Sequence, residues 1–389
     1  MEQRGGLGIL LLLLPWTPAP RAALEKAFNP CRRSIACGFF IGPRRETSHK
    51  PMIVVLKPNT SEADIAAVVQ EIKDLKYEPH ILRGVELTVI AAIGDERTHS
   101  TLETLTVFPQ VDRVMPVQSR YKLVKRQVHP SNSVIPVDGR VPIGGKKFQV
   151  MAGPCSVESE KQLMTTAHAV QKAGATILRG GAFKPRTSPY EFQGLGEEGL
   201  KLLAKAKKET GMPVITELLS EQHADLVAEY ADILQIGTRN AQNFQLLIAA
   251  AKTGKPVMLK RGLSMRIEEW LLAGEYVIAN GNPNLMFCER GIRTFETYTR
   301  NTLDLSAIPI IKQESHCPIV IDPSQGAGRA DLVTAMCKGA VAMGADALLI
   351  EVHPTPAEAW SDGAQQLTLD GFTKLMEELK PFIAAAGKE

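Results

Sequence analysis

Short apolar runs alternate with amphipathic stretches from Phe148 to the C-terminus, and this alternation restricts the fold more than any other feature. Eight runs begin the repeats: FQVMAGPCS, ATILRGGAF, PVITELL, DILQIGT, PVMLKRG, NLMFCERG, PIVIDPS and ALLIEVHP. They are continuously apolar, as expected of parallel strands that are buried on both faces. Eight strand–helix units in about 240 residues predict a (β/α)8 TIM barrel over residues 148–389. An open doubly wound sheet is the alternative, but no GxGxxG turn follows any run.

A smaller unit is predicted to precede the barrel. The run MIVVLK, from Met52, indicates a buried strand, and Ser61 is a suitable N-cap for a helix with an apolar stripe that ends at Leu75. Two further apolar runs, a helical stretch near residues 100–108 and a last strand complete the order βαββαβ within residues 52–118. This order predicts a ferredoxin-like sandwich. Residues 119–147 contain prolines and paired glycines, which predict a linker.

Residues 1–51 differ from the rest and are predicted to be an irregular N-terminal extension or a targeting segment. Their apolar run at 7–14 has the length of a signal-peptide core but is shorter than the roughly 20 residues that a membrane span needs. No later run approaches that length. Six cysteines are scattered without CxxC pairs, which favours the reduced thiols of a cytoplasmic protein. The net charge of +3 gives no indication of nucleic-acid binding. We therefore expect neither a nucleic-acid nor a membrane partner.

Charged residues follow the predicted strands at the end where TIM barrels carry their active sites. The cations are Arg179, Lys184, Arg186, Arg239, Lys260 and Arg290. Cations that converge on one opening repel one another unless anions lie between them. Arginine and lysine are the usual ligands of phosphate and carboxylate groups. The barrel opening therefore predicts a small substrate with several anionic groups.

Residues suited to metal binding also follow the predicted strands. Cys155 and Glu351 end the first and last strands, and His353 and Asp362 come shortly after the last. A cysteine with carboxylates is a plausible site for a divalent metal of the Mn, Fe, Co or Zn kind. A cysteine at a strand end is more often a small core residue. From spacing alone, both interpretations remain open.

Several motifs together resemble those of 3-deoxy-7-phosphoheptulonate synthases, the subtype with an N-terminal ferredoxin-like regulatory domain. They are AGPCSVES, LRGGAFKPRTSPYEFQGLG, QIGTRNAQNFQLL, LKRG, CERGIRTFETYTRNTLDLSA and IEVHPTPAEAWSDG. The resemblance runs from about Met52 to about Lys380. It implies an aldol-type condensation of phosphoenolpyruvate, erythrose 4-phosphate and water, which is the first step of the shikimate pathway to aromatic amino acids. It also implies inhibition by tyrosine or phenylalanine, and a homo-oligomer is expected. Related sugar-acid synthases share the chemistry, but the KPRT motif favours erythrose phosphate.

The resemblance also implies roles for single residues. Phosphoenolpyruvate would be bound by Arg179, Lys184, Arg239, Lys260 and Arg290. The phosphate of erythrose 4-phosphate would be bound by Arg186 and Thr187. The catalytic group would consist of Cys155, Lys184, Glu351 and Asp362, with a divalent metal held by Cys155, Glu351 and Asp362.

Gln325 departs from the family pattern. The stretch IDPSQGAGR resembles DPSH, whose histidine is the fourth protein ligand of the metal, but this chain has glutamine there. A glutamine oxygen is a weaker and harder ligand than an imidazole nitrogen. Three interpretations stay open: weak ligation through oxygen that favours a metal such as Mn, a metal-poor chain that is slow or only binds anionic ligands, or a sequence error or deliberate substitution. His316 precedes its strand and lies at the wrong end of the barrel to replace the histidine, whereas His353 lies at the right one.

Overall fold

The computed structural model describes residues 50–83, 88–94, 102–116, 121–127, 129–186 and 188–389. The predicted extension or targeting segment at 1–51 therefore lies almost entirely outside the described residues. The chain divides into two compact units, with the division after Val114. Within the described ranges, no helix has the length and apolar character that crossing a membrane requires.

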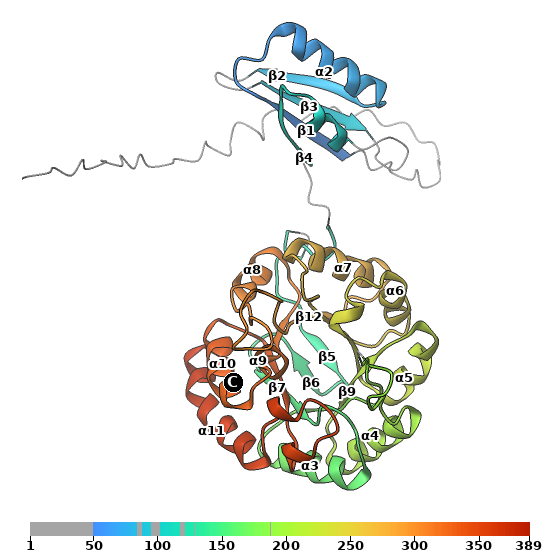
Figure 1. Cartoon of the computed structure of the whole chain (residues 1–389), viewed down its shortest axis with the longest axis vertical. Helices are drawn as coiled ribbons and strands as arrows, with labels where there is room; N and C mark the ends of the chain where they lie inside the picture. The colour runs from blue at the N-terminus through green and yellow to red at the C-terminus, as the bar shows by residue number, and fades with distance from the viewer. Residues whose placement is uncertain (1–49, 84–87, 95–101, 117–120, 128, 187) are drawn as a thin grey trace, which may run out of the picture. The chain divides into compact units, whose positions relative to one another are not determined.

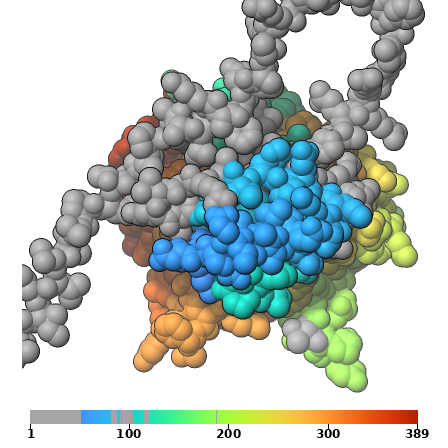
Figure 2. Space-filling model, turned by 90° about the horizontal axis from the view of Figure 1, so that it is seen from above, coloured from blue at the N-terminus to red at the C-terminus, as the bar shows by residue number. Residues whose placement is uncertain are grey.

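The first unit has the predicted ferredoxin-like topology. Its elements are β1 (Lys50–Leu56), α2 (Glu62–Asp74), β2 (Glu78–Arg83), β3 (Thr88–Gly94), the 3-10 helix η2 (Leu102–Val107) and β4 (Val111–Pro116). The sheet order is β2-β3-β1-β4. Ser61 caps α2 by accepting a hydrogen bond from the backbone N–H of Asp64. Ile65, Val68 and Ile72 of α2 are buried in the core of this unit. In the space-filling view, the atoms of β1 and α2 gather on one face of the unit (Figure 2). The second predicted helix is only a short 3-10 turn.

The second unit is a closed eight-stranded barrel, as predicted. Its strands, all parallel, are β7 (Gln149–Gly153), β8 (Ile177–Arg179), β9 (Val214–Leu218), β10 (Ile233–Ile236), β11 (Val257–Lys260), β12 (Leu285–Glu289), β13 (Ile319–Ile321) and β14 (Ala347–Glu351). The barrel closes by pairing of β14 with β7. A ring of helices surrounds it (Figure 1).

The helices follow the strands in turn. They are α3 (Glu160–Lys172), α4 (Glu197–Thr210), α5 (Ala224–Tyr230), α6 (Phe244–Lys252), α7 (Ile267–Ala279), α8 (Ala307–Glu314), α10 (Ala330–Ala342) and α11 (Leu369–Ala385). A short extra helix, α9 (Pro323–Ala327), directly follows β13. Successive strand residues point to opposite faces. Val150 and Leu348 therefore pack with the helices, whereas Met151 and Leu349 fill the barrel interior.

The segment predicted as a linker, 119–147, is instead largely part of the barrel unit. It contains a hairpin, β5 (Ile135–Val137) and β6 (Val141–Ile143). Ile135, Val137 and Ile143 are buried with interior strand residues of the barrel. The prolines suggested irregular chain, but Pro136 and Pro142 stand opposite each other in a two-stranded ladder. Proline is tolerated at the edges of sheets, and both strands here are edges.

A second part of the same segment is attached to the outside of the barrel. The carboxylate of Glu275 in α7 accepts hydrogen bonds from the backbone N–H groups of residues 122–124. His316 donates from Nε2 to the carbonyl of Leu123 at 2.9 Å, and its Nδ1 lies 2.7 Å from the Ser133 hydroxyl. His316 thus lies on the side of the barrel where β13 begins, as its place before that strand predicted.

Candidate active site

A cavity of about 220 Å³ lies at the carboxyl ends of the strands. Its lining includes all six predicted cations and one further arginine, Arg300, from the loop after β12. Three carboxylates also line it: Glu191, Glu217 and Asp362. Seven cations against three carboxylates leave an excess of positive charge in the cavity. The cations converge there because parallel strands bring their carboxyl ends to one side of the barrel. The six cations that follow the predicted strands thus meet in one cavity.

The cations differ in whether a carboxylate already neutralises them. Arg179 contacts Glu351 at 2.5 Å, and Lys260 contacts Asp322 at 2.5 Å; both pairs are buried. Arg186 contacts the more exposed Glu191 at 2.9 Å. Within the described part of the chain, Arg239 and Arg290 have no carboxylate within 4.0 Å. These two guanidinium groups are therefore available to an anionic ligand.

Lys184 crosses the cavity floor to reach Cys155. Its Nζ lies 3.0 Å from Cys155 Sγ and 3.2 Å from the Cys155 carbonyl oxygen. Gly181 makes this approach possible, because a Cβ there would lie 2.9 Å from the Lys184 side chain and 2.7 Å from the same carbonyl. Burial, with the nearby Glu351, raises the pKa of the Cys155 thiol to about 12 against the opposing effect of Lys184.

Cys155, Glu351 and Asp362 form one cluster, as the resemblance implied. Their ligand atoms all lie within 4.8 Å of one another. Burial opposes ionisation of Glu351, but Arg179 and Lys184 outweigh it and hold the pKa of this carboxyl well below its usual range. Burial and Glu351 oppose ionisation of Asp362 in the same way, and Arg300 and Lys184 lower its pKa overall. A thiol with two ionised carboxylates is a donor set that fits a divalent cation.

Gln325 lies beside this cluster, but its oxygen does not face it. Its Oε1 accepts hydrogen bonds from Arg290 (2.9 Å) and Arg300 (3.2 Å). Its Nε2 donates to Glu351 (2.9 Å) and Asp362 (3.1 Å). The expected fourth ligand is therefore near the right place, with a nitrogen that cannot ligate a cation turned toward it.

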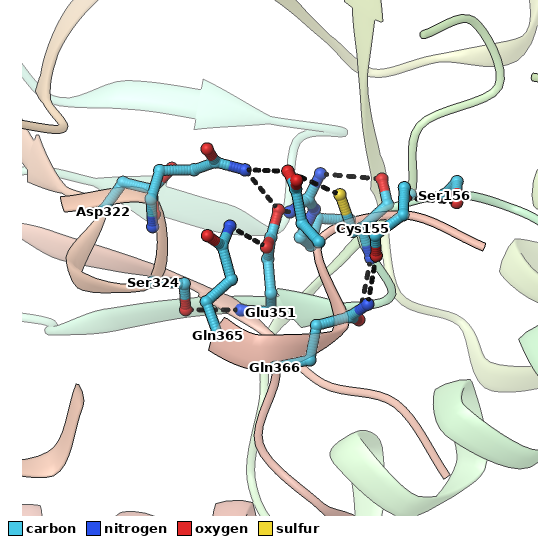
Figure 3. Close-up of polar contacts among 12 residues, drawn as sticks. Cys155, Ser156, Asp322, Ser324, Glu351, Gln365 and Gln366 are labelled. Atoms are coloured by element: carbon cyan, nitrogen blue, oxygen red, sulfur yellow. Dashed lines mark hydrogen bonds and ion pairs between the residues drawn. The ribbon is translucent and has the colours of Figure 1, made fainter. Parts of the chain in front are cut away.

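Two consecutive glutamines that were not predicted from the sequence form hydrogen bonds with Glu351 and Cys155 of the cluster (Figure 3). Gln365 donates from Nε2 to Glu351 at 2.6 Å, and its Oε1 accepts from Arg300 at 3.1 Å. Gln366 accepts from the backbone N–H of Cys155 at 3.1 Å and donates to the carbonyl of Ser361, next to Asp362. Each glutamine is only 2% exposed. In the sequence, only their place in the loop after β14, near Asp362, could have indicated that they lie at the site.

The remaining candidates have mixed outcomes. Thr187 lies outside the described residues. His353 is on the side of the barrel where β14 ends, as expected, but it is occupied elsewhere: Nδ1 accepts from the backbone of Thr355 and Nε2 lies 3.2 Å from Glu158. Glu158 also accepts from the backbone N–H of Trp360 at 2.9 Å. His353 thus supports the loop that carries Asp362 and does not replace the missing histidine of the cluster.

Comparisons with known proteins agree with this architecture. The model of the DAHP synthetase I family matches residues 127–385, and that of the DAHP synthase ferredoxin-like domain matches 52–119. A phospho-2-dehydro-3-deoxyheptonate aldolase of Thermotoga maritima is 51% identical over 336 residues, covering 86% of this chain and 99% of the relative.

Two further similarities define how specific this assignment is. A crystal structure of the Thermotoga maritima DAHP synthase has a TM-score of 0.81 and 50% identity, and covers 88% of this chain and 99% of that one. A 2-dehydro-3-deoxyphosphooctonate aldolase of Caulobacter vibrioides is 33% identical, covering 63% of this chain and 91% of its own length. The phosphooctonate aldolase is thus less similar and lacks a counterpart to part of this chain. From the family match across the barrel and the similarity across both units, the chain belongs to the DAHP synthetase I family.

Proposed function

We propose that this protein condenses phosphoenolpyruvate with erythrose 4-phosphate and water to give 3-deoxy-D-arabino-heptulosonate 7-phosphate and phosphate. The observation that carries the proposal is the excess of cations in the cavity, with Arg239 and Arg290 unpaired by any described carboxylate. The two substrates together bring two phosphates and a carboxylate. Arginine binds such groups through paired N–H donors.

The family resemblance divides the cations between the two substrates. Arg179, Lys184, Arg239, Lys260 and Arg290 line the cavity and would bind phosphoenolpyruvate. Arg186, with Thr187 beyond the described residues, would bind the phosphate of erythrose 4-phosphate. Lys184 uses two of its three N–H donors on Cys155, so one remains for the substrate. This arrangement would hold the reacting carbons close together, which lowers the entropic barrier of the condensation.

In the proposed reaction, carbon 3 of phosphoenolpyruvate forms a bond to the aldehyde carbon of erythrose 4-phosphate. The aldehyde oxygen takes up a proton and becomes a hydroxyl group. Water adds at carbon 2, and loss of phosphate leaves the ketone. Negative charge develops on the aldehyde oxygen, and the ammonium of Lys184, which lies 3.0 Å from Cys155 Sγ, would stabilise it.

A divalent metal is part of the proposal in a supporting position. Cys155, Glu351 and Asp362 would hold it, because their donor atoms form the compact set described above. When bound, it would polarise the aldehyde as a Lewis acid or orient it. Gln325 fits this role only if its amide turns over, since its nitrogen faces the carboxylates.

The test is a turnover assay on the purified full-length chain. Phosphate release would be measured with phosphoenolpyruvate and erythrose 4-phosphate, with added Mn²⁺ and with a chelator. We expect release that requires both substrates. A five-carbon aldose phosphate serves as the competing substrate, because an octonate needs five carbons beyond the three of phosphoenolpyruvate. The assignment would be overturned if phosphoenolpyruvate reacted with the five-carbon sugar phosphate and not with erythrose 4-phosphate. Binding of phosphoenolpyruvate without turnover of either sugar phosphate would favour a non-catalytic binder.

Regulation is proposed for the ferredoxin-like unit. Its core is separate from that of the barrel, and the metal-type cluster found among the described residues is in the barrel. We expect tyrosine or phenylalanine to inhibit the full-length chain and to leave a chain without residues 1–118 uninhibited. Dose–response curves on both proteins measure this. If neither amino acid inhibits the full-length chain, the regulatory role is wrong.

The proposal also includes a homo-oligomer in the cytoplasm. Tyr190 and Phe295, large apolar side chains in the segments that follow β8 and β12, are each 97% exposed, and we expect a second copy of the chain to cover them. Cys155, Cys288, Cys317 and Cys337 are free, buried thiols, which suits a reducing compartment. Light scattering on a sizing column measures the oligomeric state, and a monomer at micromolar concentration would contradict the first part.

A further inference from the structure

The side chain of Gln325 is held between groups of opposite charge. Two guanidinium groups, of Arg290 and Arg300, donate to its oxygen, and two carboxylates, of Glu351 and Asp362, accept from its nitrogen. Turning the amide over would put its NH2 group against two cations and its oxygen against two anions. All four contacts therefore require the same orientation, and the amide nitrogen faces the ligand atoms.

The backbone that carries Gln325 is fixed as well. Asp322, the N-cap of α9, accepts from the Gln325 N–H at 2.9 Å. Asn301 donates to the Gln325 carbonyl at 3.0 Å. The side chain thus starts from a fixed point at the edge of the cluster. The amide can therefore move away only by breaking its own four hydrogen bonds, because a shift of the backbone would break the bonds to Asp322 and Asn301.

Protein donors contact both oxygens of Glu351 and one oxygen, Oδ2, of Asp362. Glu351 accepts from Arg179 (2.5 Å), Gln365 (2.6 Å) and Gln325 (2.9 Å). Asp362 accepts from Gln325 and lies 3.5 Å from Arg300 and from the Cys155 thiol. Buried acceptors in such a network are satisfied by hydrogen bonds that a cation would have to replace.

We propose that Gln325 competes with the metal in this site. Its amide NH2 group bridges Glu351 and Asp362, and a divalent cation binds only by displacing it. The cation is then a weakly held, exchangeable ligand whose occupancy follows its concentration. This inference rests on the proposed function for the purpose of the site, and it goes further by assigning Gln325 as the residue that sets metal affinity. Gln325 is a positioning residue here, since it acts through the carboxylates.

The test is cobalt binding to the full-length protein after chelator treatment and desalting. Co²⁺ bound by a cysteine thiolate gives a charge-transfer absorption, which reports on Cys155 without any activity measurement. We expect weak binding by the wild-type chain. In Gln325→His, the amide N–H groups that a cation would have to displace are gone and an imidazole ligand is present. The affinity for Co²⁺ should therefore rise by more than about 10- to 100-fold. Gln235→His is the matched control, because Gln235 lines the same cavity and contacts Glu217 at 3.3 Å, outside the cluster. We expect no gain in that variant.

A second variant tests the bridge even if the histidine does not fit. Gln325→Glu is nearly isosteric and replaces both N–H donors by a third carboxylate. Without a cation, the like charges should lower its melting temperature below that of the wild type, and Mn²⁺ should restore it. Chelator should leave the melting temperature of the wild type unchanged.

Three results would overturn the inference. They are wild-type protein that keeps stoichiometric metal through chelator treatment, a Gln325→His variant that binds Co²⁺ no more tightly, and an equal gain in Gln235→His. Failure of the proposed function is recognised separately: no variant would then release phosphate from the two substrates at saturating Mn²⁺, whatever the cobalt titration gives.

Discussion

The two ends of the barrel differ in the residues that they bring together: one is lined by charged side chains and the other by apolar ones. At the carboxyl ends, the cavity is lined by seven cations and three carboxylates. In the segment before β7, Ile135, Val137 and Ile143 of the β5–β6 hairpin pack with interior residues in an apolar cluster. Charges that converge in this way repel one another and contribute little to folding, whereas buried apolar side chains stabilise the fold. The comparison predicts that apolar substitutions at the hairpin change stability without changing kinetics, and that substitutions of the cations at the opening change mainly the kinetics.

The largest expected effect is on stability, at the hairpin. Ile143 is fully buried, so Ile143→Ala removes buried methyl groups and leaves a cavity. Such substitutions cost about 2–5 kcal/mol of unfolding free energy. Urea unfolding followed by circular dichroism measures the loss, and KM for both substrates should stay unchanged. Val134→Ala is the control, because Val134 is 51% exposed. A changed KM in Ile143→Ala would mean that the two ends are coupled.

The next effect is on substrate use, at the cavity. Arg186→Ala removes a charged hydrogen-bond donor for the phosphate of erythrose 4-phosphate. Because hydrogen bonds to charged groups contribute about 1.5–3 kcal/mol, kcat/KM for this substrate should fall by about 10- to 100-fold. Binding of phosphoenolpyruvate, measured by calorimetry, should be nearly unchanged.

The control for Arg186 comes from the hairpin. Arg140 is an exposed arginine that pairs with Asp138 beside the β5–β6 turn, and Arg140→Ala removes the same charge from the other region. It should leave the kinetics of both substrates unaltered. Equal losses for phosphoenolpyruvate and erythrose 4-phosphate in Arg186→Ala would contradict the assignment of KPRT to the sugar phosphate.

Much of this comparison could be predicted from the sequence, and the reasons are physical. Arg179, Lys260 and Glu351 end strands that must be parallel in a barrel, so their convergence follows from the strand count alone. The hairpin could not be predicted in the same way. Its strands have three residues each, and Pro136 and Pro142 are typical of irregular chain.

The finer geometry of the site depends on loops that have no periodic pattern. Arg300 and Gln365 come from the loops after β12 and β14, and their meeting at 3.1 Å has no signal in either segment alone. The identity of Gln325 raised the question of its ligand role, but the answer depends on which way the amide points. That orientation is set by Arg290 and Arg300 from the loop after β12 on one side and by Glu351 at the end of β14 on the other. A sequence read in order cannot supply such a joint constraint.

The smallest expected effect is a pH dependence of stability with opposite signs in the two regions. Glu217, in the cavity, has its pKa raised above the ordinary 4.5 by burial, despite Lys184 and Lys260 nearby. Asp138, beside the hairpin turn, has its pKa lowered below the ordinary 3.8 by its hydrogen bond from Arg140. A raised folded-state pKa means that the folded state binds more protons than the unfolded state, so the contribution of Glu217 is present below the unfolded pKa and is lost as pH rises through the folded one. A lowered pKa means that the contribution of Asp138 is present above the unfolded pKa and is lost as pH falls through the folded one.

Melting temperatures of Glu217→Gln and Asp138→Asn, each compared with the wild type from about pH 3 to pH 7, measure both contributions. Replacement by the neutral amide removes the titration of each group. Relative to the wild type, Glu217→Gln should therefore gain stability as the pH rises above the unfolded pKa of glutamate, whereas Asp138→Asn should lose stability as the pH rises above the folded pKa of the aspartate. Asp138 is largely exposed, so solvent screening keeps its effect small. Slopes of the same sign in the two variants would mean that the Glu217 carboxylate is not held at a cost to stability, and the contrast between the two regions would then rest on packing alone.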